Sequence, residues 1–357
     1  MRIAYYITNH GYGHASRNVP IIRELGRRHS DLQVAIKSDQ RRCDFLRRNF
    51  ASDDLRITYH EDCNEHGLVM SEGHAVPDIA RMRRLVTDEI ASFSQMIERE
   101  MAFLAAFDPD VVVCDIICWG LGAAHQLGIP SLLIGNFTWE SMYRSFFGED
   151  LWGPYHDLYA QASEVLWYDV HSPLLDQTLP HARTISLVSR DSDAKEVADI
   201  RGGHDRPLVF VSVGASVRLS EAIDVSGLPY DFVTTDGVEL VGPNVSRLSP
   251  LMTNTPDYVA ASDYVIAKGG WSSVAEILLA HKPCALLMRG ANDEDDATKA
   301  ILEGRGHCVA VQEEDLSDMG VVLERVKSLR PQTYDRYHDS RTEICDAIEQ
   351  LAVGGRA

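Results

Sequence analysis

The chain has no excess of positive charge and no long apolar run, and each absence excludes a class of protein. It carries 34 lysines and arginines against 53 aspartates and glutamates, for a formal net charge of -19. General nucleic-acid binding needs clustered lysine and arginine, so this class is excluded, while a local basic pocket for a small anion stays open. No stretch approaches a membrane span, and the apolar start is too short for a signal peptide, so no transmembrane segment is expected.

Cysteine is scattered, and no cluster of metal-ligating residues stands out. The seven cysteines are odd in number. Cys114 and Cys118 are four residues apart, but no second cysteine or histidine pair accompanies them, so buried free thiols are a better interpretation than a zinc site. Free thiols are typical of a reducing compartment, so we expect a cytoplasmic protein. Since no metal-ligating cluster stands out, we also expect no bound metal, and we expect no cofactor.

The first half of the chain alternates short apolar runs with helical patterns. Strands are predicted at 2–7, 32–36, 55–59, 111–114 and 131–134, and helices at 15–28, 79–104 and 119–127. This alternation indicates a mostly parallel sheet covered by helices, with the carboxyl ends of the strands, where ligands bind, at one edge. The aromatic-rich segment 137–168 is interpreted either as a helix pair packed on the sheet or as one wall of a binding cleft.

A second alternating series follows the polar segment 189–206, which contains a Gly-Gly pair and is the best candidate for a linker. Strands are predicted there at 208–213, 230–234, 239–241, 264–267 and 284–288, with a helix at 272–279. We therefore predict an α/β protein with two Rossmann-like domains, 1–188 and 207–330, of ordinary size for a chain of 357 residues. Residues 331–357 are expected to end in a helix that returns to the first domain.

Two histidines stand where the first strand should turn into a helix. The turn in HGYGHASR (10–17) needs Gly11 and Gly13, but it does not need His10 or His14. Asp115 ends a later strand at the same predicted edge of the sheet. From the residues alone, a histidine here either caps the turn or takes part in chemistry.

The second motif is VIAKGGWSSVAEILLAHKPCALLM (265–288). The glycine pair lets backbone N–H groups approach a ligand, the two serines are expected to cap the following helix, and a helix N-terminus attracts anions. Glu276, one turn later, is placed to bind ribose hydroxyls. The alternative is an ordinary strand–turn–helix with a capping serine and a solvated glutamate. The candidate nucleotide-binding residues in this motif are Lys268, Gly269, Gly270, Ser272, Ser273 and Glu276.

This segment resembles the nucleotide-sugar signature of GT-B glycosyltransferases, in which Gly-Gly, Ser/Thr and Glu recur before an apolar strand. It is also similar to the box of plant natural-product glycosyltransferases, although that box has a histidine where this chain has Lys268. A lysine still neutralises a diphosphate. The acidic loop RGANDEDD (289–296) falls where that family contacts the sugar. Further donor-binding residues are expected from the resemblance or from position after a strand: Gly11, Gly13, Gly214, Ser216, Arg218, Asn292, Asp293 and Glu294.

The N-terminal half resembles the same superfamily. HGYGHASR has the GxGHxxR form of its first loop, and IGNFTWESMY (134–143) is similar to the glycosyltransferase-like part of plant arabinokinases, which also carries HGxGHAxR. The resemblance implies GT-B architecture, with two domains facing each other across a cleft, and a dyad in which His14 removes the acceptor proton and Asp115 holds the histidine. His10 is the alternative base. The residues expected to bind the acceptor are His10, Asn136, Trp139 and Glu140.

Three functions fit these motifs. The first is a glycosyltransferase that moves a sugar from a nucleotide-diphosphate sugar, with UDP the commonest donor of the family, to a small-molecule or glycan acceptor with inversion. The second is a nucleotide-sugar hydrolase that uses water, and the third is a non-catalytic sensor. The acidic run 293–296 is interpreted as a solvated loop rather than a metal site, because GT-B enzymes generally need no metal.

Overall fold

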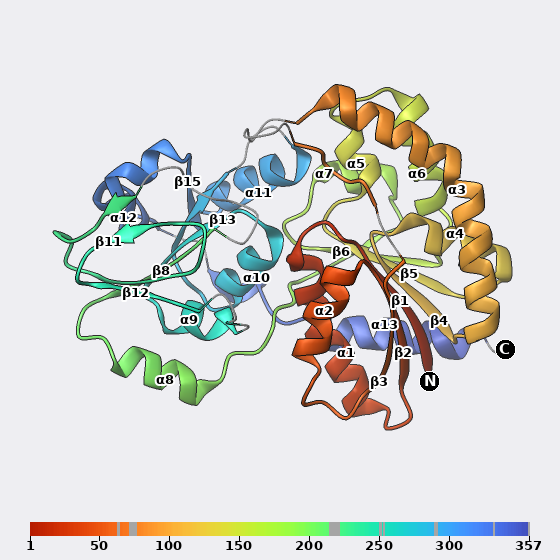
Figure 1. The fold of residues 1–357 in the computed structure, drawn as a ribbon, viewed down its shortest axis with the longest axis horizontal. Helices are drawn as coiled ribbons and strands as arrows, with labels where there is room; N and C mark the ends of the chain where they lie inside the picture. Colours follow the sequence, from red (N-terminus) through yellow and green to blue (C-terminus); the bar gives the residue numbers. More distant parts are fainter. Residues whose placement is uncertain are drawn as a thin grey trace. The chain divides into compact units, whose positions relative to one another are not determined.

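The computed structural model describes residues 1–62, 65–70, 77–213, 222–249, 252, 254–288, 292–330 and 333–355. The chain divides into two compact units, each with its own parallel sheet (Figure 1). The first unit comprises Met1–Ser186, Ala291–Glu294 and Ser340–Ala357, and the second comprises Leu187–Gly290 and Asp295–Asp339. The predicted fold class, an α/β protein with two Rossmann-like domains, is confirmed.

The sheet of the first unit has seven parallel strands in the order β3-β2-β1-β4-β5-β6-β7. The strands are β1 Arg2–Ile7, β2 Gln33–Lys37, β3 Arg56–His60, β4 Val111–Asp115, β5 Ser131–Gly135, β6 Glu164–Tyr168 and β7 Arg183–Ile185. The helices are α1 Tyr12–Arg28, α2 Gln40–Asn49, α3 Ile79–Phe107, α4 Cys118–Leu127, α5 Trp139–Arg144, α6 Glu149–Tyr159, α7 Pro173–Thr178 and α13 Arg341–Gly354.

Helices cover both faces of this sheet, which is why its central strands are continuous apolar runs. Successive strand residues point to opposite faces. Ala4 and Tyr6 share a buried core with residues of α3, α4 and α6. Tyr5 points the other way and donates a hydrogen bond to Asn18 of α1 (2.6 Å). Helix α13 packs beside α1 on that second face (Figure 1).

The second unit repeats this strand order. Its six-stranded parallel sheet has the order β12-β10-β8-β13-β14-β15, and β9 and β11 form a separate parallel pair. The strands are β8 Leu208–Ser212, β9 Ile223–Asp224, β10 Asp231–Thr234, β11 Leu240–Val241, β12 Val245–Arg247, β13 Tyr264–Lys268, β14 Cys284–Leu287 and β15 Cys308–Val311. The helices are α8 Ala194–Gly202, α9 Thr255–Ala261, α10 Trp271–Leu279, α11 Asp293–Gly304 and α12 Met319–Lys327, with short 3-10 turns at Glu314–Asp318 and Tyr334–Arg336.

The structure corrects two local predictions, and it contains elements that were not predicted, among them α2. Helix α1 begins at Tyr12 rather than at 15, because Gly11 takes a left-handed conformation (φ 82°) at its N-cap. Helix α2, with only two buried residues, has too weak an apolar pattern to be predicted. The polar segment 189–206, predicted as a linker, contains α8, which has no buried residue and so gives no apolar signal.

A buried ion pair joins the sheet of the first unit to α3. Lys37, the last residue of β2, contacts Glu100, and both side chains are almost fully buried. Glu100 also accepts a hydrogen bond from Tyr6 (2.9 Å) and lies 3.3 Å from the half-exposed Arg99. A carboxylate buried this deeply needs compensating charge, so the pair fixes α3 on this face.

Lys37→Met is expected to destabilise the protein by about 3 kcal/mol, because it leaves Glu100 buried with Arg99 as its remaining cation. Urea unfolding measured by circular dichroism checks this. The double variant Lys37→Met with Glu100→Leu should recover most of the loss, since neither charge is then buried. A double variant less stable than Lys37→Met would contradict the assignment.

Candidate active site

The histidine of the first motif and the aspartate of β4 lie at the switch point of the first sheet. Strand order reverses between β1 and β4, so the chain leaves these neighbouring strands toward opposite faces. In open α/β sheets, ligands bind at the carboxyl ends of the strands at such a switch point. His14 is the third residue of α1, which follows β1, and Asp115 is the last residue of β4. The parallel register pairs Ile7 with Asp115, which puts the two strand ends level.

The structure brings His14 and Asp115 into direct contact. His14 Nδ1 lies 2.7 Å from Asp115 Oδ1, and the two residues are 6% and 0% exposed. Arg17 donates from Nε to Asp115 Oδ2 (2.8 Å) and from Nη2 to Oδ1. Asn18 donates from Nδ2 to Oδ2 (2.7 Å). Asp115 is therefore a buried carboxylate surrounded by donors, all from the first two turns of α1.

The contacts of His14 Nδ1 indicate which ring nitrogen carries the proton. Its Nδ1 also lies 2.9 Å from Arg17 Nη2. An arginine only donates, so Nδ1 could accept from Arg17 or donate to Asp115, but not both. We assign the proton to the bond with Asp115, since a carboxylate is the stronger acceptor and Arg17 Nη2 already donates to the same oxygen. This assignment leaves a lone pair on Nε2 for accepting a proton.

Burial and charge set the protonation states of this cluster. Burial, and then the charge of Arg17, lower the pKa of His14 below its usual 6.5, so the imidazole is neutral at neutral pH. Burial by itself would raise the pKa of Asp115, but Arg17 and His14 outweigh it and hold that pKa well below the usual range. Arg17 thus keeps Asp115 ionised, and it adds to the effect of burial in keeping His14 neutral.

Sequence reasoning missed Arg17 and Asn18 as site residues. Both follow His14 on one face of α1, at three and four residues, and Arg17 is also the arginine of the GxGHxxR form. Arg17 also donates from Nη1 to Asn136 Oδ1 (2.6 Å), and its guanidinium lies over the ring of Tyr168, 4.9 Å from the centroid. Asn136, predicted to bind acceptor, directly follows β5 at the same edge of the sheet and is 1% exposed.

His10 and Trp139 adjoin this cluster. Their rings meet edge to face with centroids 5.1 Å apart. Trp139 is fully buried, and its Nε1 donates to Glu65 Oε1 (2.6 Å). Thr8, which accepts a hydrogen bond from the backbone N–H of His10, contacts the other oxygen of Glu65. Glu65, which sequence reasoning missed, therefore joins the first loop to α5.

The aromatic-rich segment 137–168 forms a helix pair packed on the sheet, which is the first of the two interpretations of its sequence. Its helices α5 and α6 are joined by Glu140, which is fully buried. One carboxylate oxygen of Glu140 accepts from Arg144 (2.8 Å), and the other lies 3.1 Å from His156 Nδ1. Glu140 thus has a packing role, and its contact with acceptor stays a prediction.

The nucleotide motif lies at the corresponding switch point of the second unit, after β13. Lys268 ends that strand and is half-buried. A Cβ on Gly269 would come within 2.9 Å of Met288 Sδ, so packing by itself accounts for this glycine, whereas one on Gly270 would meet only Lys268 Cε, at 3.4 Å. Gly214, Ser216 and Arg218, which were expected to bind the donor, lie outside the described residues.

The serines do not cap α10, contrary to expectation. The helix begins at Trp271, which is 3% exposed, and its N-cap is Gly270. Ser272 and Ser273 are therefore the second and third residues of the helix, in the turn whose backbone N–H groups favour anions. Glu276 is one turn further and is 9% exposed rather than solvated.

The acidic run 293–296 is likewise corrected, since it forms the first turn of α11 and not a loop. Asn292 and Glu294 are buried, at 3% and 8% exposure, and Asp293 is half-buried. Carboxylates are favourable at a helix N-terminus. Within the described ranges, no group of three or more His, Cys, Asp or Glu side chains is arranged to hold a metal. None of the helices in this part of the chain is long and apolar enough to cross a membrane.

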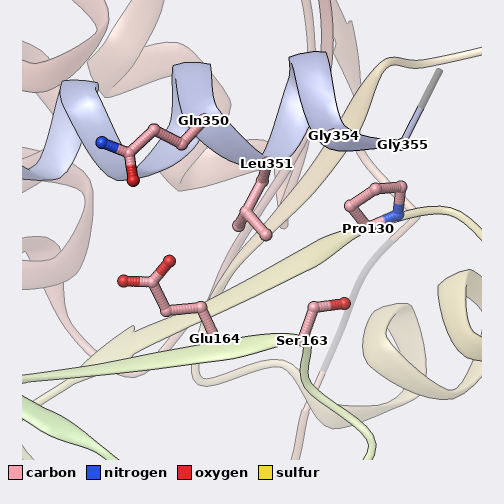
Figure 2. Close-up of a pocket in the computed structure, with 7 residues that line it drawn as sticks. All are labelled: Pro130, Ser163, Glu164, Gln350, Leu351, Gly354 and Gly355. Atoms are coloured by element: carbon pink, nitrogen blue, oxygen red, sulfur yellow. The ribbon is translucent and has the colours of Figure 1, made fainter. Parts of the chain in front are cut away.

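One open pocket lies away from both motifs. It has a volume of about 400 Å³ and lies where the end of α13 meets the amino ends of β5 and β6 (Figure 2). Its lining residues are Pro130, Ser163, Glu164, Gln350, Leu351, Gly354 and Gly355. Since His14 and Asp115 are at the carboxyl ends of their strands, this pocket belongs to the opposite edge of the sheet.

Comparison with known proteins agrees with this architecture. Residues 1–143 match the family model described as glycosyl transferase family 1. The chain is 26% identical over 370 residues to L-arabinokinase of Arabidopsis thaliana, covering 98% of this chain and 34% of that protein. It thus spans about a third of this relative's length.

Two solved structures share the fold over nearly the whole chain. The glycotransferase of kitacinnamycin has a TM-score of 0.63 at 18% identity, covering 98% of each chain. Arabidopsis thaliana UGT89C1, complexed with UDP-L-rhamnose, has a TM-score of 0.63 at 12% identity and covers 99% of this chain and 97% of its own. The chain has the GT-B fold. The predicted resemblance to GT-B glycosyltransferases and plant arabinokinases is confirmed.

The site of this GT-B protein yields a prediction about pH and stability. Burial raises the pKa of Glu65 from 4.5 to about 8. The folded protein therefore keeps a proton that the unfolded chain loses, so stability from this group is full below about pH 4.5 and is lost as pH rises toward 8. Glu65→Gln cannot ionise, so its melting temperature should exceed that of wild type by a margin that grows from pH 5 to 8.5, reaching the equivalent of a few kcal/mol.

The matched control is Glu98→Gln, on the exposed side of α3. Differential scanning calorimetry of both variants across this pH range makes the comparison. A margin for Glu65→Gln that stays constant with pH would show that Glu65 has an ordinary pKa.

Proposed function

We propose that this protein is a glycosyltransferase that moves a sugar from a nucleotide-diphosphate sugar to an acceptor hydroxyl, with His14 as the general base. The observation that carries the proposal is the buried contact between His14 and Asp115 at the switch point of the first sheet. A neutral imidazole, oriented by a carboxylate on Nδ1, is the arrangement that a proton acceptor at Nε2 requires.

The mechanism follows from these protonation states. Nε2 of His14 takes the proton of the acceptor hydroxyl as that oxygen attacks the anomeric carbon. The bond from this carbon to the diphosphate oxygen breaks, and the nucleoside diphosphate leaves with the electron pair. Attack opposite the leaving group inverts the anomeric centre. Asp115 stabilises the imidazolium that forms, and Arg17 keeps Asp115 ionised.

The donor is assigned to the second unit. The N-terminal turn of α10, with Lys268 before it, supplies donors and positive charge for a diphosphate. Glu276 supplies acceptors for ribose hydroxyls. UGT89C1 was solved with UDP-L-rhamnose, which supports a UDP-sugar as the first donor to test. The first unit would then bind the acceptor, near His10 and Asn136.

His14→Ala is expected to lower kcat by about 10²–10⁴-fold, the usual contribution of a positioned base, while UDP affinity is unchanged because the donor binds mainly to the other unit. Asp115→Asn should lose a similar amount or less. The losses should not multiply in the double variant, since residues that act as one unit are non-additive. Steady-state kinetics and calorimetry measure both quantities.

His10→Ala is the contrast variant, because His10 is the alternative base in the same loop. Full activity in His14→Ala together with inactivity in His10→Ala would transfer the role to His10. In wild type, kcat/KM should fall only below pH 6.5, as His14 becomes protonated. Multiplicative losses in the double variant would remove Asp115 as the partner of His14.

The reaction itself is tested by following nucleotide release from UDP-, dTDP- and GDP-sugars, with and without cell extract as a source of acceptor. We expect release that depends on the extract and persists in EDTA, because Lys268 and a helix N-terminus carry the diphosphate charge. Equal release without extract would indicate hydrolysis. Loss of turnover in EDTA with recovery in Mg²⁺ or Mn²⁺ would refute metal independence.

A further inference from the structure

Arg190 lies in the segment between β7 and α8 and contacts Glu276, the residue proposed to bind the ribose. Its Nη2 lies 3.0 Å from Glu276 Oε1 on α10 and 3.0 Å from Thr255 Oγ1 at the start of α9. The three residues come from separate parts of the chain, with Arg190 65 positions before Thr255 and 86 before Glu276. No motif in the sequence marks Arg190.

The Arg190–Glu276 ion pair is buried. The two side chains are only 10% and 8% exposed. A carboxylate this deep in the protein is costly without a cation, and arginine is the residue that cannot lose its charge. Arg190 therefore compensates the buried carboxylate of Glu276 and holds it in one orientation.

The backbone around Arg190 is fixed as well. Leu187 donates its N–H to the carbonyl of His338 (3.2 Å), and Asp193 donates its N–H to Asp257 Oδ1 (2.7 Å). These bonds hold the segment on both sides of Arg190, and α8, which follows it, packs against α9. The guanidinium is thus part of a constrained segment rather than a mobile surface arm.

We propose that Arg190 is a positioning residue of the nucleotide site, which holds Glu276 in the orientation that accepts the ribose hydroxyls. This inference rests on the proposed function. A carboxylate offers about four lone-pair sites, and the bond to Arg190 uses one, so acceptor capacity remains for two hydroxyls. Charge-assisted hydrogen bonds of this kind depend on a fixed carboxylate, and removal of Arg190 would release it.

The opposite role, in which Arg190 competes with ribose for Glu276, predicts a different result. A competitor must leave when the nucleotide binds, so its removal would tighten binding. The second bond to Thr255 favours positioning, because it holds the guanidinium in place independently of Glu276.

The test is calorimetric binding of UDP, GDP and their 2′-deoxy counterparts to wild type, Arg190→Ala, Arg190→Gln, Glu276→Ala and the Arg190→Ala, Glu276→Ala double variant. Arg201→Ala is the matched control, because Arg201 is a half-exposed arginine on the neighbouring α8 that pairs with Asp263 at 3.4 Å. Arg190→Gln keeps a hydrogen-bond donor but no charge, and it serves if Arg190→Ala does not fold.

We expect Arg190→Ala to weaken binding of the preferred nucleotide about 10-fold and to reduce its preference over the 2′-deoxy form, as Glu276→Ala does. Arg190→Gln should fall between Arg190→Ala and wild type, and Arg201→Ala should match wild type. The double variant should bind no more weakly than Glu276→Ala, because Arg190 acts through Glu276.

Two outcomes overturn the inference alone: wild-type affinity and 2′-hydroxyl preference in both Arg190 variants, or tighter binding in either. If wild type prefers the ribonucleotide and Glu276→Ala keeps the same preference, Glu276 does not bind the ribose, and the inference about Arg190 fails as well. A wild-type protein that binds none of these nucleotides overturns the proposed function itself.

Discussion

The carboxyl edge of the first unit depends on one buried carboxylate, Asp115. It is fully buried and accepts hydrogen bonds from His14, Arg17 and Asn18. Burying such a charge is unfavourable unless its lone pairs are filled, and every one of these donors lies in the first two turns of α1. The same contacts therefore dock α1 on β4, fix the turn at Gly11 and orient His14, so local folding and site geometry have one cause.

Sharing of Asp115 between His14 and Arg17 also determines what the cluster can do. Before reaction the charges of Asp115 and Arg17 cancel and His14 is neutral. After His14 accepts a proton, the buried cluster carries one net positive charge, which is unfavourable in a low-dielectric site. In the proposed reaction the departing nucleoside diphosphate gains one negative charge, which equals the positive charge that His14 gains. This balance supports the proposed role of His14 as base, and the N-cap of α1 is Gly11 rather than a histidine.

The sequence predicted the parts of this protein that depend on local patterns. Apolar, β-branched runs gave most strands to within a residue or two, and the rule that ligands bind at carboxyl strand ends placed His14 and Asp115 at one edge. Helices α2 and α8 were not predicted because they bury almost nothing. Strand β6 and helices α9 and α12 were also not predicted, although each has buried residues. Arg190 was missed because its contact with Glu276 joins residues 86 positions apart, and no local pattern reports such a pair.

Each unit has a buried carboxylate paired with an arginine at the switch point of its sheet. Asp115 has Arg17, and Glu276 has Arg190. Glu65 shows what happens without such a partner. Its donors, Thr8 and Trp139, are neutral, and burial raises its pKa to about 8, whereas the pKa of Asp115, at least as deeply buried, is lowered. Arginine does not titrate at physiological pH. Arg17 therefore keeps Asp115 anionic despite its burial, whereas Glu65, whose hydrogen-bond donors are neutral, retains its proton at neutral pH.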